Sequence, residues 1–308
     1  MAYNKTMSAA IQTSGLSKKY SAKGPLAINQ LSLNVQDREI YGFLGPNGAG
    51  KSTTIRLLLN FIQPSSGYAT INGLDIVKDG LEIKRSVGYI PSDMGIYKKM
   101  TGDQYLKYMA ELRGGISKSY LKQLLRRLRV EGDKKLGDLS RGNRQKINIV
   151  QAFMHEPKIL IFDEPTSGLD PLMQEEFFAL TKEAKQKGST IFMSSHILSE
   201  VQKTCDRVGI IREGVLVDEK TISELANEAS QTFDLIFSGK PPVKELKLVK
   251  GVKRLSEKDG RVTLHYHGDL PVLLAKLSNY TITSIETRQL DLEEVFMHYY
   301  QSSGEVKQ

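Results

Sequence analysis

Residues 45–52 have the sequence Gly-Pro-Asn-Gly-Ala-Gly-Lys-Ser, and this short stretch decides the fold of the chain. It matches the pattern G-x-x-x-x-G-K-[ST] at every specified position. The apolar run Ile40–Leu44 precedes it, and apolar residues at helical spacing follow it between Lys51 and Phe61. Strand, glycine-rich loop and helix in this order form the context that a phosphate-binding loop needs. The stretch therefore predicts an α/β fold with a nucleotide-binding site.

The residue types of this loop suit the binding of a nucleoside triphosphate. Its glycines let backbone N–H groups turn toward phosphate oxygens, and the positive end of the following helix dipole adds to the attraction. Lys51 supplies a positive charge for the β- and γ-phosphates, and the hydroxyl of Ser52 is a ligand for Mg²⁺. The loop residues predicted to bind nucleotide are Gly45, Pro46, Asn47, Gly48, Ala49, Gly50, Lys51, Ser52 and Thr53.

A second apolar run, Ile159–Phe162, ends in two acidic residues, Asp163 and Glu164. The carboxyl ends of parallel strands meet at one edge of a sheet, so this pair is expected beside the phosphate loop. Asp163 is expected to hold Mg²⁺ through water, and Glu164 to orient and deprotonate the attacking water. The pattern therefore predicts ATP and Mg²⁺ as cofactors and ATP hydrolysis as the reaction.

The segment Leu-Ser-Arg-Gly-Asn at residues 139–143 narrows the choice among nucleotide-hydrolysing proteins. It resembles the signature LSGGQ of the nucleotide-binding domain of ABC transporter ATPases, with Arg141 in place of the first glycine and Asn143 in place of the glutamine. Ser140 offers a hydroxyl and Gly142 permits close backbone approach. Both lie where a helix is expected to begin, and the positive end of a helix suits a γ-phosphate.

Three further segments resemble the same family. Residues 167–170, Ser-Gly-Leu-Asp, resemble its D-loop, of which Asp170 is the acidic residue. Residues 194–196, Ser-Ser-His, resemble its switch segment, which implies that His196 hydrogen-bonds the γ-phosphate and orients water. Tyr20 lies where the family stacks an aromatic ring on adenine.

The resemblance covers residues 11–220 and implies a working unit of two copies. Each ATP would be held by Lys51 and Ser52 of one copy and by Ser140 and Gly142 of the other, so the nucleotide-binding domains form a homodimer. The partner implied is a transmembrane permease on a separate chain. The helical region between residues 101 and 130 would transmit the motion to it.

Residues 92 and 93 depart from the family pattern. Residues 87–91 resemble a strand that the family usually follows with a glutamine, which contacts Mg²⁺ and couples to the membrane subunit. At this position the chain has Ser92, followed by Asp93. A serine is too short for the same reach, so Asp93 or a water substitutes for the glutamine, or the coupling runs differently. Together with Arg141 and Asn143, this pattern resembles the exporter-type subset with a separate permease, whose chains end in an appendage finishing like Leu-Glu-Glu-Val-Phe at residues 292–296.

The periodicity predicts two domains. Strands alternating with helices over residues 1–220 indicate an α/β core with a largely parallel sheet, and a helical subdomain is expected at about residues 92–155. From residue 221 the pattern changes to alternating strands such as Phe233–Phe237, a hairpin turn at residues 258–260 and a helix at Asp269–Asn279. A last helix is expected from Asp291. Residues 221–308 are thus predicted to form a small α+β accessory domain.

Charge and hydropathy limit the location and the partners. Between Lys98 and Lys146 there are 14 Lys and Arg against 5 Asp and Glu. The surplus of positive charge in this stretch, 14 − 5 = +9, exceeds the net charge of the whole chain, +8. This stretch is a solvated helical face, a contact surface for a membrane-facing partner or anionic lipid, or a nucleic-acid contact. Few aromatic residues accompany it, so base stacking is not favoured and no nucleic-acid partner is expected.

No apolar run approaches the roughly 18–20 residues that span a bilayer, and residues 1–10 do not resemble a signal peptide. Cys205 is the single cysteine, which fits a reducing compartment. The expected location is therefore the cytoplasmic face of the plasma membrane, through the permease, or the cytoplasm when the chain is free.

Three other functions remain as alternatives. An ABC-type ATPase acting on ribosomes or nucleic acid would carry two cassettes or long coiled-coil insertions, and neither pattern is present. A non-hydrolysing nucleotide sensor is opposed by Glu164 and His196. An importer ATPase is opposed by the altered signature, by the missing glutamine at residue 92 and by the C-terminal appendage.

Overall fold

The computed structural model describes residues 9–21, 23–92, 97–228, 231–258, 260–266 and 268–289. Two compact units make up the chain, Met1–Lys220 and Thr221–Gln308. The helix expected from Asp291, the segment at residues 292–296 and Asp93 lie outside the described residues.

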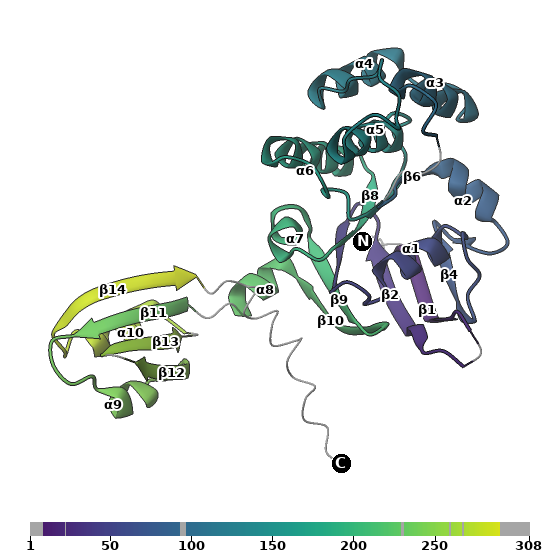
Figure 1. The fold of residues 1–308 in the computed structure, drawn as a ribbon. Helices are drawn as coiled ribbons and strands as arrows, with labels where there is room; N and C mark the ends of the chain where they lie inside the picture. The colour runs from purple at the N-terminus through teal and green to yellow at the C-terminus, as the bar shows by residue number, and fades with distance from the viewer. Residues whose placement is uncertain are drawn as a thin grey trace, which may run out of the picture. The chain divides into compact units, whose positions relative to one another are not determined.

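A six-stranded sheet forms the centre of the first unit, in the order β10-β9-β3-β8-β7-β6 (Figure 1). The pairs β6–β7, β7–β8, β8–β3 and β3–β9 are parallel, as the sequence predicts. The carboxyl ends of β3, β7 and β8 therefore meet at one edge. The strands are β3 (Ile40–Leu44), β6 (Val87–Ile90), β7 (Ile159–Asp163), β8 (Thr190–Ser195), β9 (Arg207–Arg212) and β10 (Val215–Thr221).

Helices cover both faces of this sheet because its central strands are apolar on both sides. Every residue of β7 is buried. Ile159 and Ile161 belong to a core cluster shared with α1 (Lys51–Leu58). Phe162 points the other way and packs against Phe153 of α5 (Arg141–Phe153) and Phe177 of α6 (Pro171–Gln186). This sandwich holds the ends of the strands at fixed positions.

A separate antiparallel sheet lies on the other side of α1, in the order β2-β1-β4-β5 (Figure 1). Its strands are β1 (Ala9–Lys19), β2 (Leu26–Gln36), β4 (Ser66–Ile71) and β5 (Leu74–Asp75). The sequence predicts strands within residues 11–35, but not that they form a sheet of their own. The reason is that β1 pairs with β4 across more than forty residues, which no local pattern reveals.

The helical region between residues 101 and 130 consists of two helices, α3 (Gly102–Leu112) and α4 (Lys118–Arg127). Gly114 and Gly115 separate them, and both have positive φ, which glycine adopts readily. Arg113 ties this region to α2 (Gly80–Ser86), because its guanidinium donates to the carbonyl oxygens of residues 84, 85 and 87. The end of α3 therefore contacts the end of α2.

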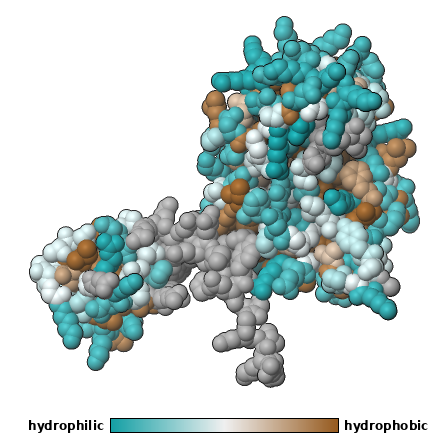
Figure 2. Space-filling model, viewed as in Figure 1, coloured by the Kyte–Doolittle hydropathy of each residue, from teal (hydrophilic) through white to brown (hydrophobic). Residues whose placement is uncertain are grey.

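Exposed basic side chains follow one side of α4 and the turn after it. Lys118, Lys122, Arg126 and Arg129 recur every three or four residues and are all exposed. Figure 2 shows hydrophilic residues gathered over the part of this unit where Figure 1 places α3 and α4. Arg127 lies on another side and forms ion pairs with Glu176 and Glu183 of α6.

The second unit is an antiparallel sheet in the order β12-β13-β11-β14, with helices α8 (Ile222–Glu228), α9 (Val243–Lys247) and α10 (Leu270–Leu277). Its apolar face, which includes Phe233, Leu235 and Leu264, packs against Leu273 of α10. The predicted hairpin joins β12 and β13, since Lys258 pairs with Arg261. Its strands are β11 (Gln231–Phe237), β12 (Val252–Lys258), β13 (Arg261–Tyr266) and β14 (Ile282–Gln289).

Candidate functional site

The phosphate loop runs from the end of β3 to the beginning of α1. Gly48 has φ 82° and Gly50 has φ 112°, conformations that side chains other than glycine rarely adopt. Gly45 has no room for a side chain, because a Cβ there would collide with the carbonyl oxygen of Ile211 on β9. The glycines are thus required by the geometry of the turn, and the turn presents the first N–H groups of α1.

Lys51 is buried within this loop. Its Nζ donates to the carbonyl oxygens of Gly45 at 2.7 Å and Pro46 at 3.0 Å, and lies 3.4 Å from Oε1 of Glu164. A buried ammonium requires such partners, because burial removes its water. All three partners are oxygens that phosphate oxygens could replace.

Asp163, at the end of β7, faces the loop from the neighbouring strand. Its Oδ1 accepts hydrogen bonds from the hydroxyls of Ser52 at 3.0 Å and Ser194 at 2.9 Å, and the residue is almost fully buried. These oxygens form a compact group of the kind that Mg²⁺ prefers. Among the described residues, no three His, Cys, Asp or Glu side chains cluster in a way that could hold a metal ion. Mg²⁺ does not need such a cluster, since it takes one or two protein oxygens together with phosphates and waters.

Glu164 follows in a strained backbone conformation, with φ 50°. Its N–H donates to Oγ of Ser194 at 3.1 Å, which holds the residue in place. Its Oε1 lies 3.3 Å from Nδ1 of His196 as well as 3.4 Å from Lys51. His196 is nearly half exposed and Glu164 about a quarter, so water can reach both side chains. Lys51, Glu164 and His196 therefore converge on one accessible point.

The signature segment begins α5. The hydroxyl of Ser140 accepts the N–H of Asn143 at 3.2 Å and caps the helix. Gly142 lies against residue 168, and a Cβ on it would collide with the carbonyl oxygen of Gly168. Arg141 is exposed. In the part of the chain that the structure describes, no hydrogen bond or ion pair joins residues 140–143 to residues 45–53.

Asp170 caps a helix. Its Oδ1 accepts the N–H of Met173 at 3.0 Å at the beginning of α6, whose first residue is Pro171. Between Asp170 and the acidic pair, the carbonyl oxygen of Pro165 accepts a hydrogen bond from the Gln145 side chain of α5 at 2.7 Å. The loop after β7 is thus fastened both to α6 and to the signature helix.

Comparison with known proteins agrees with this geometry. Residues 28–167 match the family model described as ABC transporter. The chain is 34% identical over 299 residues to the bacitracin transport ATP-binding protein BcrA of Enterococcus faecalis, covering 94% of this chain and 96% of that one. The chain belongs to the ABC transporter ATP-binding proteins. It is thus an ATP-binding, ATP-hydrolysing subunit of the transporter type, as the sequence predicts.

Two further matches support the same family. The BcrA protein of Bacillus licheniformis is 42% identical over 216 residues, with 69% of this chain and 70% of that protein covered. A solved structure of an ATP-binding subunit of an ABC transporter superposes with a TM-score of 0.65 at 31% identity, over 71% of this chain and 92% of the other. Both BcrA proteins are named for transport, which favours the transporter interpretation over action on ribosomes or nucleic acid.

Tyr20 and Thr53 lie together at the edge of this ABC-type site. The Tyr20 hydroxyl is 3.2 Å from Oγ1 of Thr53, the second residue after Lys51, and the Tyr20 residue is 58% exposed. The Lys18 ammonium lies 5.6 Å from the centre of its ring. An exposed aromatic face beside the phosphate loop is available for a purine base.

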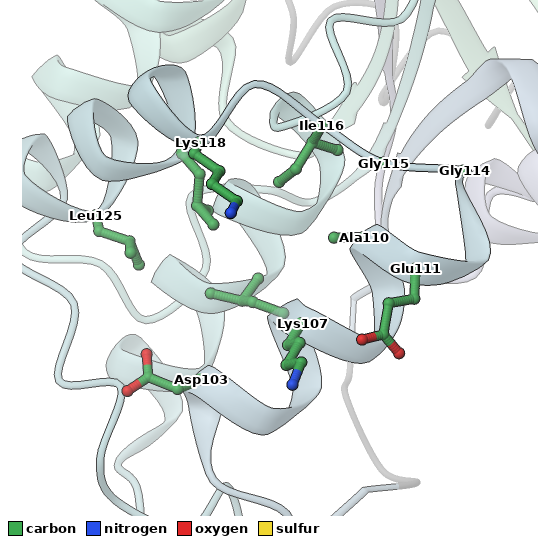
Figure 3. A pocket seen from close by; sticks show the side chains of 11 residues that line it. Asp103, Lys107, Ala110, Glu111, Gly114, Gly115, Ile116, Lys118 and Leu125 are labelled. Carbon is green, nitrogen blue, oxygen red and sulfur yellow. The ribbon is translucent and has the colours of Figure 1, made fainter.

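Ser92 follows β6 and is half-buried, and none of the side-chain hydrogen bonds of the described residues involves it. A hollow lies between α3 and α4, with a volume of about 680 Å³ (Figure 3). Its walls include the apolar residues Leu106, Ala110 and Leu121 and the basic residues Lys107 and Lys118. None of its lining residues belongs to the phosphate loop, the acidic pair or the signature segment.

Sequence reasoning missed three polar residues around the acidic pair. Ser194 bridges Asp163 and Glu164, while Thr166 and Glu200 form a buried hydrogen bond next to them. A signal for Ser194 was present, since it is the last residue but one of β8, the strand that leads to His196. Glu200 gave none, because a glutamate in the first turn of a short helix, α7 (Leu198–Thr204), is ordinarily a surface residue.

Proposed function

We propose that this chain is the hydrolytic subunit of an exporter, works as a homodimer and drives a separate transmembrane permease at the cytoplasmic face of the plasma membrane. The observation that carries the proposal is the convergence of Lys51 and His196 on Oε1 of Glu164. That point holds a base, a cation and a hydrogen-bonding ring within reach of one phosphate loop. The altered signature supports export, and the two BcrA relatives, which are named for bacitracin transport, support a role in transport.

Hydrolysis follows from an exchange of partners at this point. Bound ATP offers phosphate oxygens to Lys51, which then leaves Glu164 and the loop carbonyls. Glu164 is released to accept a proton from the attacking water, and the Lys51 charge stabilises the negative charge that develops on the phosphate. His196, next to Glu164, donates a hydrogen bond to the γ-phosphate and orients the water.

Ser52 and Asp163 fit Mg²⁺, because their oxygens are already hydrogen-bonded to each other. Mg²⁺ neutralises phosphate charge when it is bound. Ser52 would contact it directly and Asp163 through water. Metal contact by Ser92 or Asp93 would replace the glutamine that the family usually has at that position.

The signature segment serves the second copy in this proposal. The exposed Ser140 and Arg141 and the half-buried Gly142 and Asn143 lie at the positive end of α5, and no hydrogen bond among the described residues joins them to the chain's own phosphate loop. Facing copies would therefore hold ATP between the loop of one and α5 of the other. The γ-phosphate joins the two copies, and its hydrolysis removes that link.

A permease has an apolar surface available on α2 and α3. Leu81 of α2 is 66% exposed and Leu112 of α3 is 60% exposed, and Arg113 holds the ends of these helices together. None of the helices formed by the described residues is long and apolar enough to cross a membrane. Residues 1–220 would form the nucleotide-binding domain, with residues 92–155 as its helical subdomain. Residues 221–308 would form an accessory domain.

The Glu164→Gln variant tests this function. The amide cannot accept the proton, so ATP should bind and hydrolysis should stop. Sizing chromatography with ATP and Mg²⁺ should then show a stable dimer, and the same protein without nucleotide should elute as a monomer. A Glu164→Gln protein that stays monomeric at saturating ATP would contradict the shared site.

A further inference from the structure

Glu200 is a buried carboxylate without a cationic partner in the described part of the chain. The residue is 6% exposed, and none of the ion pairs formed by the described residues includes it. Its charge is instead stabilised by two hydroxyls. Oε1 accepts a hydrogen bond from Thr166 at 2.5 Å and Oε2 accepts one from Ser195 at 2.7 Å. Both hydroxyl-bearing residues are themselves buried, so water does not compete for these bonds.

The two hydroxyls belong to the two loops that carry the reacting groups. Thr166 is the second residue after Glu164, and Ser195 immediately precedes His196. The backbone pairing between β7 and β8 ends at Asp163 and Ser194. Beyond that pair, no strand ladder maintains the spacing of the two loops. Glu200 bridges them where the sheet has stopped.

Ser195 extends this bridge to the phosphate loop. Its carbonyl oxygen accepts the N–H of Gly45 at 3.2 Å, and its hydroxyl accepts the N–H of Ile197 at 2.9 Å. Ser195 thus has its backbone bound to the phosphate loop and its side chain bound to α7. One carboxylate therefore connects three segments: the loop after β7, the switch segment and, through Ser195, the phosphate loop.

We infer that Glu200 is a positioning residue for ATP hydrolysis, and that it sets the approach of Glu164 to His196; this rests on the roles proposed above for those two residues. The side chain of His196 is 44% exposed and that of Glu164 is 24% exposed, so packing alone does not hold them at 3.3 Å. Their backbones must be held instead, and the Thr166–Glu200–Ser195 bridge does so from the buried side. A misplacement of about 1 Å at a reacting group can slow a reaction on the order of a hundredfold.

The pair Thr166→Val and Thr166→Ser tests the bridge. Valine keeps the shape of threonine without the hydroxyl, whereas serine keeps the hydroxyl. Thr166→Val should lower kcat by at least about tenfold and leave the KM for ATP within about twofold, because substrate binding does not use the bridge. Thr166→Ser should restore kcat to within about threefold of the unchanged protein.

The double variant Thr166→Val with Glu200→Gln tests whether the two residues act as one unit. If they act through the same bridge, the double variant should be no slower than the slower single variant, since effects through one shared contact do not add. Tyr41→Phe is the matched control. It removes a hydroxyl that donates to another carboxylate, Glu219, at 2.6 Å. Tyr41 is the second residue of β3, four residues before Gly45, and its hydroxyl does not contact the Thr166–Glu200–Ser195 bridge, so kcat should be unchanged.

Three outcomes would overturn the assignment. The first is an unchanged kcat in Thr166→Val. The second is a fall in kcat that Thr166→Ser does not restore, and the third is a loss of ATP affinity and melting temperature in proportion to kcat, as a purely structural role would give. Glu164→Gln in the same assay distinguishes a failure of the proposed function from a failure of the role assigned to Glu200. If Glu164→Gln stops hydrolysis and Thr166→Val does not slow it, only the role of Glu200 fails; if Glu164→Gln hydrolyses normally, both fail.

Discussion

The phosphate loop and the signature segment both begin a helix, yet their polar groups have different surroundings. Around the loop, Lys51, Ser52, Asp163 and Glu164 contact one another within the same chain. At the signature, the Ser140 hydroxyl caps its own helix and Arg141 is exposed. The phosphate loop and the residues around it are assembled within a single copy. The signature segment instead presents a helix end that no hydrogen bond or ion pair among the described residues joins to the phosphate loop of its own chain. The two regions should therefore respond differently to substitution.

Lys51→Ala should have the largest effect, on the binding of ATP to a single copy. Removing a charged donor to phosphate costs about 1.5–3 kcal/mol, so the affinity should fall by about tenfold to a hundredfold. Isothermal titration calorimetry with a slowly hydrolysed ATP analogue measures it. An unchanged affinity would break the comparison, because the loop would then not be the single-copy binding site.

Acid should lower the free energy of unfolding through His155, which lies next to the signature helix. Burial, and secondly the nearby Arg113, lowers the pKa of His155, just past α5, from 6.5 to about 4. As pH falls through 6.5, the unfolded chain takes up the proton before the folded one, so stability present above pH 6.5 is lost down to pH 4. The free energy of unfolding should drop by up to about 2 kcal/mol at pH 5.

Urea unfolding between pH 7 and pH 5 measures this loss. His155→Gln carries no titrating ring and should flatten this part of the pH dependence. If the variant and the unchanged protein lose the same stability between these pH values, burial of His155 does not explain the acid response.

Gly142→Ala should slow hydrolysis without weakening single-copy binding. The added methyl would collide with the carbonyl oxygen of Gly168, so α5 or the loop after β7 must shift. A fall in kcat of about tenfold is expected from this misplacement. Calorimetry under the conditions used for Lys51→Ala should give an unchanged affinity. A loss of affinity as large as that of Lys51→Ala would mean that the two regions are not separate in one copy.

Ser140→Ala should have the smallest effect, on stability. It removes the side-chain cap of α5, which typically costs about 1 kcal/mol. Thermal unfolding should show a small decrease in melting temperature, and Ser140→Asn, which keeps a capping oxygen, should reverse most of it. If Ser140→Asn restores stability but not ATP hydrolysis, the hydroxyl has a use beyond the cap, as the shared site requires.

Much of the fold was predictable because its signals are local. The run Ile40–Leu44 followed by the glycine-rich loop identifies a strand, a turn and a helix without knowledge of any distant residue. The pair β1–β4 was not predictable in the same way, since its partners are far apart in sequence. Asp170 was interpreted only by its resemblance to a D-loop. Asp followed by Pro also commonly begins a helix, and this local signal would have predicted the start of α6.

By itself, the sequence determined the class of chemistry. Lys51, Asp163 and Glu164 lie in patterns whose spacing has few other uses, so a phosphate loop and an acidic strand end follow from the residues alone. Only the tertiary structure decided which oxygen each hydroxyl contacts, and thereby revealed Ser194 and Glu200. The sequence does not indicate which carboxylate a hydroxyl will contact. Thr166 and Glu200, and Asp163 and Ser194, are each more than thirty residues apart, so only the packing of β7 against β8 brings them together.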